Sequence, residues 1–514
     1  MEYLLFFLFL VLICLGIYKL RFFKSTSLSF AVLVFVFAIK LIAGLGLNVL
    51  YSKYYTDKNT SDIYKYFDDS KYLSDVASVS SIEYFKLMYN SRSTNTLAQA
   101  QVVKMKNWSD KNSNYLKITN APESDVFNSQ RTMIRLNSLL RFLSLGFLPI
   151  HTLFFCLLGF IGQILLFKAF IGFVPNRKNQ LLLVVFFIPS VVLWTSAALK
   201  ESVIYFGLGL FIYYLLSSNI KQFKFYFFLA FSVLILLFLK SYLAIMLLIA
   251  AFGYYTILYF NKKQIIVLLG LLLFLVLSLV VNKPETIPLK TVAMKMQNEK
   301  NIARGGYYLN DIDCPENQIY IEENYFKSLN LLPVNKDEYI IPEGINYNKY
   351  FKGHIFDDEL LKTTKKDQYY LMLNYQRAGS YLENTNLSPS IVSFIAFLPK
   401  AILNVFLEPL IYKANSVLLL FSSLENVAIF ILLIFSFVFL KFDESYNAII
   451  VFNLLFALCL LFLVAYTTPI AGNIVRYKIP AITFLMINFV LSYNETRIRG
   501  FYINIISFLN RIRR

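Results

Sequence analysis

The sequence predicts an all-α membrane protein that crosses the bilayer many times. Of its 514 residues, 57% are hydrophobic and only 16% are charged, whereas a soluble protein carries roughly 25% charged residues. Apolar runs long enough to cross a bilayer recur from one end of the chain to the other. Because every backbone polar group must be paired inside lipid, such runs are expected to fold as helices.

Composition also argues against several function classes. The net charge is +18, but the basic residues are scattered at span ends and in loops. This pattern indicates a membrane surface or an anionic lipid head group as the partner and argues against nucleic acid. The histidines, His151 and His354, are far apart, so histidine general-base chemistry is not expected. The four cysteines show no disulfide or zinc spacing, no metal ligands are assigned, and no nucleotide-binding glycine motif is visible.

Eleven spans are expected, together with two large polar loops at residues 51–131 and 283–388. The first span is expected to be retained and not cleaved as a signal peptide, because it lacks a basic leading region and a cleavage site. The spans lie at about residues 3–18, 28–50, 144–170, 181–192, 203–216, 225–239, 242–260, 265–281, 427–440, 448–466 and 479–491.

Two further segments differ from ordinary spans. Residues 389–423 are apolar but contain Pro399 and Glu408-Pro409, which suits a re-entrant or interfacial pair of helices. Residues 494–514 carry five arginines among apolar residues and are expected to form an amphipathic helix on an anionic leaflet. The predicted units are residues 1–50, 51–131, 132–282, 283–388, 389–423, 424–493 and 494–514. Spans three to eight lie in 132–282, and spans nine to eleven lie in 424–493.

Orientation follows from the short basic loops, which favour the cytoplasmic side of a membrane. The loops after spans one, three, five, seven and nine, and the tail, are basic. The N-terminus is therefore expected outside and the C-terminus in the cytoplasm. Both large polar segments then fall outside.

The joint between spans four and five is the most conspicuous stretch of the chain. It reads PSVVLWTSAALKES over residues 189–202 and contains Trp194, Lys200 and Glu201. Charges between two spans are costly in hydrocarbon, so a tight hairpin at one membrane face is expected. The side chains form either a polar wall of a site or an interfacial Lys–Glu pair beside an aromatic-belt tryptophan.

An acidic stretch follows the second span, with Asp57, Asp62 and Asp68 among tyrosines. In a helix, Asp62 and Tyr66 share one face. A carboxylate here could act as a general base towards a sugar hydroxyl or bind a divalent cation. The alternative is a solvated acidic helix.

A basic set lies at the expected outer ends of several spans: Lys200, Lys240, Arg476 and Lys478, with Lys40 about halfway along span two. Together these cations could clamp a phosphate or pyrophosphate, although each alone could simply snorkel to the interface. Lys40 is a separate functional candidate because ionisable residues are rare at that depth.

Two Arg–Gly–Tyr stretches in the second polar segment are candidates for contact with substrate. They contain Arg304 and Arg377. Glycine allows close approach of backbone to a ligand, and the tyrosines could stack on sugar rings. Ordinary turns would give the same pattern.

Several of these stretches resemble polytopic glycosyltransferases of the GT-C fold and bacterial surface-polysaccharide proteins. Asp62 followed by Tyr66 resembles the acidic motif of the first external loop of GT-C enzymes. The joint, the LEP and LEN tripeptides at residues 407–409 and 424–426, and GNIVRYKIP at 472–480 resemble multi-spanning proteins of polysaccharide gene clusters. O-antigen-type polymerases share the large external loops and the external arginines.

The resemblance implies a GT-C-like fold, Asp62 as the base, and Lys200, Lys240 and Arg476 around the phosphate of a lipid-linked sugar. In the family the acidic residues follow the first span, whereas here they follow the second, so the choice among Asp57, Asp62 and Asp68 stays open.

The predicted function is that of a glycosyltransferase or polysaccharide polymerase that uses a polyprenyl-(pyro)phosphate-linked sugar on the outer face. The expected partners are membrane lipid, a lipid-linked saccharide and polysaccharide assembly proteins, with no nucleic acid and no assigned cofactor. The alternatives are a transporter or flippase of a lipid-linked or anionic substrate, and a non-catalytic scaffold.

Overall fold

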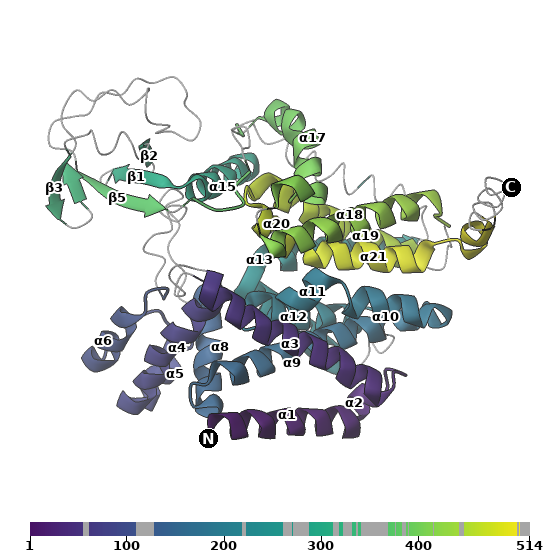
Figure 1. The fold of residues 1–514 in the computed structure, drawn as a ribbon, viewed down its shortest axis with the longest axis horizontal. Coiled ribbons are helices and arrows are strands. Elements are labelled where there is room, and N and C mark those ends of the chain that lie inside the picture. Colours follow the sequence, from purple (N-terminus) through teal and green to yellow (C-terminus); the bar gives the residue numbers. More distant parts are fainter. Residues whose placement is uncertain are drawn as a thin grey trace.

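The computed structural model describes the chain as a mostly helical bundle (Figure 1). The described residues are 1–54, 61–108, 128–217, 223–260, 270, 287–311, 318–321, 331–335, 338–340, 369–375, 377–382, 387–388, 390–414, 416–441, 447–500 and 503.

Six helices in these ranges are long and apolar enough to cross a membrane, so the chain is a helical multi-pass membrane protein. A seventh crossing is added if α20 (Ala471–Tyr477) and α21 (Ile479–Ser492), which meet at 51°, form one broken span. The six are α1 (Glu2–Lys19), α3 (Phe30–Tyr54), α9 (Leu148–Ile171), α13 (Phe223–Phe260), α18 (Val417–Val438) and α19 (Asn447–Thr467).

Four of the expected spans take a different form, and a fifth cannot be compared. Residues 181–192 are divided between two short helices, α10 (Lys178–Phe186) and α11 (Pro189–Trp194), and α12 (Lys200–Leu215) has only 16 residues. The sixth and seventh spans both lie in α13, an element of 38 residues. Its two halves meet at Lys240, where the backbone is not helical. The expected eighth span, residues 265–281, lies almost wholly outside the described residues.

Residues 389–423, expected to form a re-entrant or interfacial pair of helices, contain one complete helix and the start of a second. α17 (Ile391–Leu407) is one helix that contains Pro399, and the next long helix, α18, already begins at residue 417. Glu425 does not interrupt α18, because its carboxylate accepts hydrogen bonds from the Ser190 backbone N–H and hydroxyl. A paired carboxylate is tolerated inside an apolar bundle. Short helices α2 (Arg21–Lys24), η2 (Pro175–Arg177) and η3 (Ile411–Lys413) complete the connections.

Close backbone contacts lock α12 and its preceding turn against α9 and α3. A Cβ on Gly209 would lie 2.2 Å from the Gly162 carbonyl oxygen, so α9 and α12 touch at their backbones. Gly44 and Gly159 are equally close to the carbonyls of Ser196 and Thr195, respectively. Small residues at helix interfaces are typical of membrane bundles. Here they fix the position of the stretch that precedes Lys200 and Glu201.

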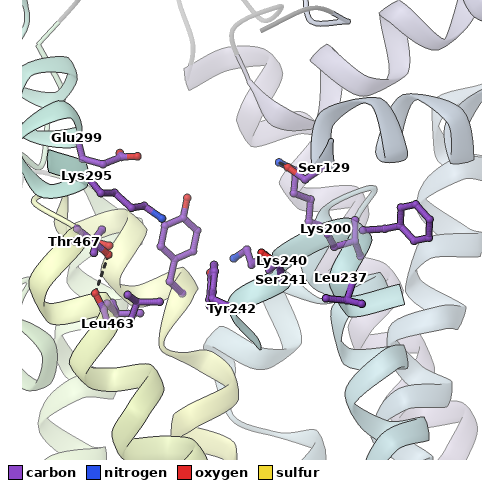
Figure 2. Close-up of a pocket in the computed structure, with 15 residues that line it drawn as sticks. Ser129, Lys200, Leu237, Lys240, Ser241, Tyr242, Lys295, Glu299, Leu463 and Thr467 are labelled. Atoms are coloured by element: carbon purple, nitrogen blue, oxygen red, sulfur yellow. Dashed lines mark hydrogen bonds between the residues drawn. The ribbon is translucent and has the colours of Figure 1, made fainter. Parts of the chain in front are cut away.

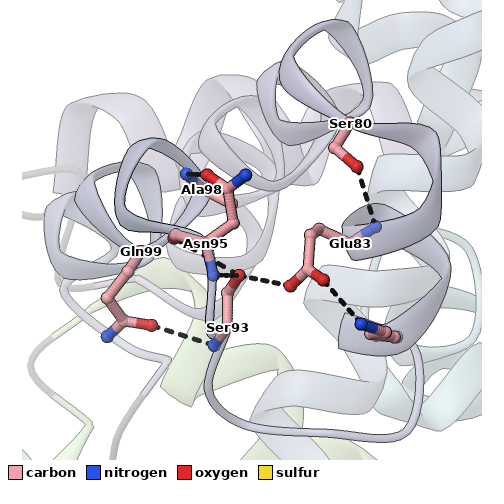
Figure 3. A network of polar contacts seen from close by, with 7 residues as sticks. Ser80, Glu83, Ser93, Asn95, Ala98 and Gln99 are labelled. Carbon is pink, nitrogen blue, oxygen red and sulfur yellow. Dashed lines mark hydrogen bonds and ion pairs between the residues drawn. The ribbon is translucent and has the colours of Figure 1, made fainter.

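The first polar segment is a folded helical unit rather than an open loop. It contains α4 (Asp62–Val79), α5 (Ser81–Leu87) and α6 (Thr96–Lys104) and packs on α8 (Ser129–Ser144). The Glu83 carboxylate accepts from Lys86 and from the Ser93 hydroxyl, and the Asn95 side chain caps α6. Figure 3 shows the contacts of Glu83 with Ser93 and of Asn95 with Ala98. These bonds join α5 to the start of α6.

The second polar segment departs from the all-α prediction. After α15 (Ile287–Arg304) it forms a five-stranded antiparallel sheet of order β2-β1-β5-β4-β3. The strands are β1 (Gly306–Asp311), β2 (Gln318–Ile321), β3 (Leu332–Asn335), β4 (Glu338–Ile340) and β5 (Tyr369–Tyr375). Aromatic and aliphatic residues dominate β5, as is typical of strands. Both polar segments lie at the same end of the bundle, on the left in Figure 1.

Candidate functional site

Arg476 is the centre of a buried charged cluster formed by four separate elements. Its Nη1 lies 2.6 Å from Asp62 Oδ2 at the start of α4, and its Nη2 lies 2.7 Å from Glu201 Oε2 in the first turn of α12. Lys240, at the break in α13, places its Nζ 3.5 Å from Glu201 Oε1. The structure therefore brings together Asp62, Lys240 and Arg476, which sequence reasoning assigned to one site, and uses Glu201 to join them.

Lys200 is a further member of this cluster and is held by a hydroxyl group. Its Nζ donates to the Ser129 hydroxyl at 2.8 Å and lies 5.4 Å from the ring centre of the buried Tyr66. Rings also cover the other cations, since Trp194 is 5.5 Å from the Arg476 guanidinium and Tyr477 is 4.0 Å from Lys240 Nζ. Aromatic faces attract cations most strongly where water is excluded.

The cluster carries more positive than negative charge. Lys200, Lys240 and Arg476 oppose Asp62 and Glu201, so three cations face two carboxylates and one positive charge is left over. The Glu201 side chain is only 5% exposed and that of Arg476 only 9%. Within the described part of the chain, the buried Arg476 Nε has no hydrogen-bond partner. A buried excess of positive charge favours binding of an anion.

Asp62 is ionised in this arrangement. Burial by itself would raise its pKa, but the charges of Arg476, Lys200 and Lys65 and the hydrogen bond from Arg476 outweigh burial and hold the pKa well below its usual range. A general base works best with a pKa near the working pH. The geometry therefore suits Asp62 to orienting Arg476 better than to accepting a proton.

A cavity of about 570 Å³ adjoins the cluster and reaches two of its cations (Figure 2). Its polar lining comes from α8, α12, α13, α15, α19 and α20, and its apolar lining from α13 and α19. The described residues that line it are Ser129, Lys200, Leu237, Phe238, Leu239, Lys240, Ser241, Tyr242, Lys295, Glu299, Leu463, Val464, Thr467, Thr468 and Tyr477.

Sequence reasoning missed Lys295 and Glu299, which line this cavity from α15. They lie four residues apart and so share one helix face. The stretch KMQNEK at residues 295–300 is polar and reads as an ordinary solvated helix. Only its position over Lys240 and Tyr242 distinguishes it, and no local signal could have found it.

Lys40 and Lys478 lie apart from the cavity. Lys40 is fully buried and donates to the Thr195 hydroxyl, so it fastens α3 to the turn before α12. Lys478, expected beside the phosphate, is placed at the bend after α20 and donates to the Val405 carbonyl at 2.6 Å. Both are explained by hydrogen bonds that hold helices together.

Asp68, one of the two alternatives to Asp62, is also separate from the cavity. Asp68 lines a second, more peripheral pocket of about 320 Å³ with Lys65, Lys106 and Arg141. Asp57 lies outside the described residues. Among the described residues, no group of three or more His, Cys, Asp or Glu side chains could hold a metal ion.

The two Arg–Gly–Tyr stretches meet each other rather than the cavity. The Ala378 N–H donates to the Ala303 carbonyl at 2.9 Å, and Gly305 has φ +75° with the Arg377 backbone nitrogen 2.5 Å from where a Cβ would lie. Arg377 is exposed, and neither it nor Arg304 lines the cavity. The stretch continues to Ser380, whose carbonyl accepts from Ala471 and so ties the second polar segment to the start of α20.

A buried serine–histidine–asparagine chain resembles a catalytic triad in its contacts alone. His151 Nδ1 is 2.8 Å from Asn137 Oδ1, and Nε2 is 2.7 Å from Ser144 Oγ. All three residues are fully buried, so the chain serves the packing of α8 against α9.

No protein-family model, no curated protein and no solved structure matches this chain. Its class is therefore defined by the fold and the site: a helical multi-pass membrane protein with a cation-lined cavity at the end of the bundle that carries its polar segments.

Proposed function

We propose that this chain is a membrane-embedded glycosyltransferase or polysaccharide polymerase that takes its sugar from a polyprenyl-phosphate or polyprenyl-pyrophosphate donor. The observation that carries the proposal is the cavity with Lys200 and Lys240 in one wall and a buried cluster with excess positive charge behind it. Such a wall fits a phosphate group, and the neighbouring leucines and Val464 fit the isoprenoid chain.

The same cations would assist the chemistry. Transfer breaks the bond between the anomeric carbon and a phosphate oxygen, so negative charge develops on the phosphate. Fixed cations in a water-poor site stabilise such charge, and this is commonly the largest catalytic contribution. Tyr242 and Tyr477 line the cavity beside Lys240 and would present aromatic faces to the sugar ring.

The finer topology belongs to this proposal as well. An N-terminus outside, a cytoplasmic C-terminus, eleven crossings and a GT-C-like arrangement in a bacterial inner membrane would place the cavity on the outer face. The clustering of both polar segments at the cavity end of the bundle supports this arrangement. Surface polysaccharide is assembled on that face.

Binding of polyprenyl phosphate to the purified protein in lipid nanodiscs tests the proposal. Because Arg476 and Lys240 set the field of the site, Arg476→Ala and Lys240→Ala should each weaken binding by roughly 10–150-fold, which corresponds to the 1.5–3 kcal/mol of a charged hydrogen bond. Arg499→Ala is the control, since its side chain is 76% exposed and pairs only with Glu495 among described residues. Equal binding by all four proteins, or none by the wild type, would refute the phosphate site.

A transporter or flippase for a lipid-linked or anionic substrate is the second candidate. It is favoured by the break of α13 at Lys240, because discontinuous helices line the substrate sites of many transporters. Movement of a fluorescent lipid-linked phosphate across proteoliposomes without new glycosidic product would establish it. A scaffold would show neither activity.

A further inference from the structure

The cavity has two chemically different walls. Lys200 and Lys240 approach from α12 and α13, while Lys295 and Glu299 project from α15 on the opposite side (Figure 2). A donor phosphate bound at the first wall would leave its sugar directed towards the second. A carboxylate on that side is suitably placed for an acceptor hydroxyl.

Glu299 differs from the carboxylates of the charged cluster. Asp62 and Glu201 are both engaged by Arg476, and neither lines the cavity. Glu299 is the acidic residue among the described residues that line the cavity, and it forms no salt bridge with another described side chain. Burial raises the pKa of Glu299, and the charge of Lys295 one turn earlier opposes this only in part. A raised pKa makes a carboxylate a stronger base once it is ionised.

We propose, resting on the function proposed above, that Glu299 is the catalytic base that takes the proton of the acceptor hydroxyl. The acceptor oxygen forms a bond to the anomeric carbon of the donor sugar as the bond from that carbon to the phosphate oxygen breaks. The bonding electron pair leaves with the phosphate, which Lys200 and Lys240 hold. The acceptor proton passes to the Glu299 carboxylate and is later lost to water.

Glu299→Gln is the direct test, because the amide keeps the shape of the side chain but cannot take a proton. The rate of sugar incorporation by membranes of a complemented deletion strain should fall by about 10²–10⁴-fold. Binding of polyprenyl phosphate should be unchanged, since the phosphate lies at the other wall. Glu299→Asp should retain part of the activity because it keeps the carboxylate.

A double variant separates catalysis from simple neutralisation of Lys295. If Glu299 only balances that charge, Glu299→Gln combined with Lys295→Gln should recover activity. If Glu299 is the base, the double variant should be as inactive as Glu299→Gln. Glu495→Gln is the matched control, because it removes an exposed carboxylate that pairs with Arg499 and does not line the cavity.

The outcomes distinguish this inference from the function on which it rests. Wild-type activity in Glu299→Gln, or recovery in the double variant, overturns the role of Glu299 while loss of binding in Arg476→Ala still supports the phosphate site. Absence of both sugar incorporation and polyprenyl-phosphate binding in the wild type overturns both.

Discussion

Replacing Glu201 by glutamine should destabilise this protein more than neutralising Asp62, the other carboxylate of the charged cluster. Glu201 accepts from Arg476 at 2.7 Å and faces Lys240 at 3.5 Å, and its side chain is 5% exposed. Glutamine preserves the volume and removes the charge. Three cations would then face Asp62 alone, so the excess rises from one positive charge to two.

The expected magnitude follows from burial. Removing one member of a buried ion pair costs about 3–5 kcal/mol, because the remaining charge is left uncompensated. Asp62→Asn should cost only about 1 kcal/mol, since the Asp62 side chain is 31% exposed and water can solvate what remains. Adding Lys240→Gln to Glu201→Gln should recover about 0.5–3 kcal/mol, as expected for groups in direct contact.

Thermal unfolding of the detergent-solubilised protein measures the order of these effects. The temperature at which half of the protein leaves the monodisperse fraction should fall in the order wild type, Asp62→Asn, the Glu201→Gln and Lys240→Gln double variant, and Glu201→Gln. The reasoning fails if Glu201→Gln is as stable as Asp62→Asn, or if the double variant is less stable than Glu201→Gln.

Four further outcomes are expected. Asp62→Asn should lower sugar transfer far less than Glu299→Gln does, and an equal or larger loss in the same membrane assay would return the base to Asp62. Lys295→Gln removes the charge that lowers the pKa of Glu299, so Glu299 stays protonated to higher pH. The acidic limb of the pH–rate profile should therefore move to higher pH, while Lys200 and Lys240 across the cavity are unchanged. A profile that does not move would contradict the assignment of Glu299 as the base. Gly209→Leu should lower the free energy of unfolding by more than about 3 kcal/mol and sharply lower the yield of folded protein, because even a Cβ would lie 2.2 Å from the Gly162 oxygen. Gly46→Leu is the control and should be tolerated, because no atom lies within 4 Å of its Cβ position. In a cysteine-free variant, a cysteine beside Asn95 should react with an impermeant reagent in intact cells and one beside Asn176 should not, and the reverse pattern would place the cavity on the cytoplasmic face.

The buried charges near the cavity should make the stability of the protein depend on ligand binding. Five charges near the end of an apolar bundle cost solvation energy, and the observed ion pairs recover only part of that cost. Arg476 connects α4 to α12 through its ion pairs with Asp62 and Glu201. Lys240, at the break in α13, also pairs with Glu201 and so connects α13 to the same cluster. A bound phosphate would neutralise the remaining charge, so ligand binding and stability of this end of the bundle should be coupled.

The sequence by itself determines that this is a helical membrane protein and where most of its long helices lie, because hydropathy is a local property that adds along a run of residues. It also singles out Asp62, Lys200, Lys240 and Arg476, since charges at the ends of apolar runs are conspicuous. Which of these residues contact one another is decided only by tertiary structure. Asp62 and Arg476 form an ion pair although they are 414 residues apart in the sequence, so no local pattern could predict it. The position of Glu299 is also decided by tertiary structure, because the cavity that it lines is formed with α13 and α19. Glu425 is tolerated in α18 because Ser190 of α11 donates hydrogen bonds to it. The strands of the sheet, likewise, acquire their partners only when distant segments pair. Burial and charge pairing depend on what surrounds a residue in space, and these decide which of the conspicuous side chains belong to the site.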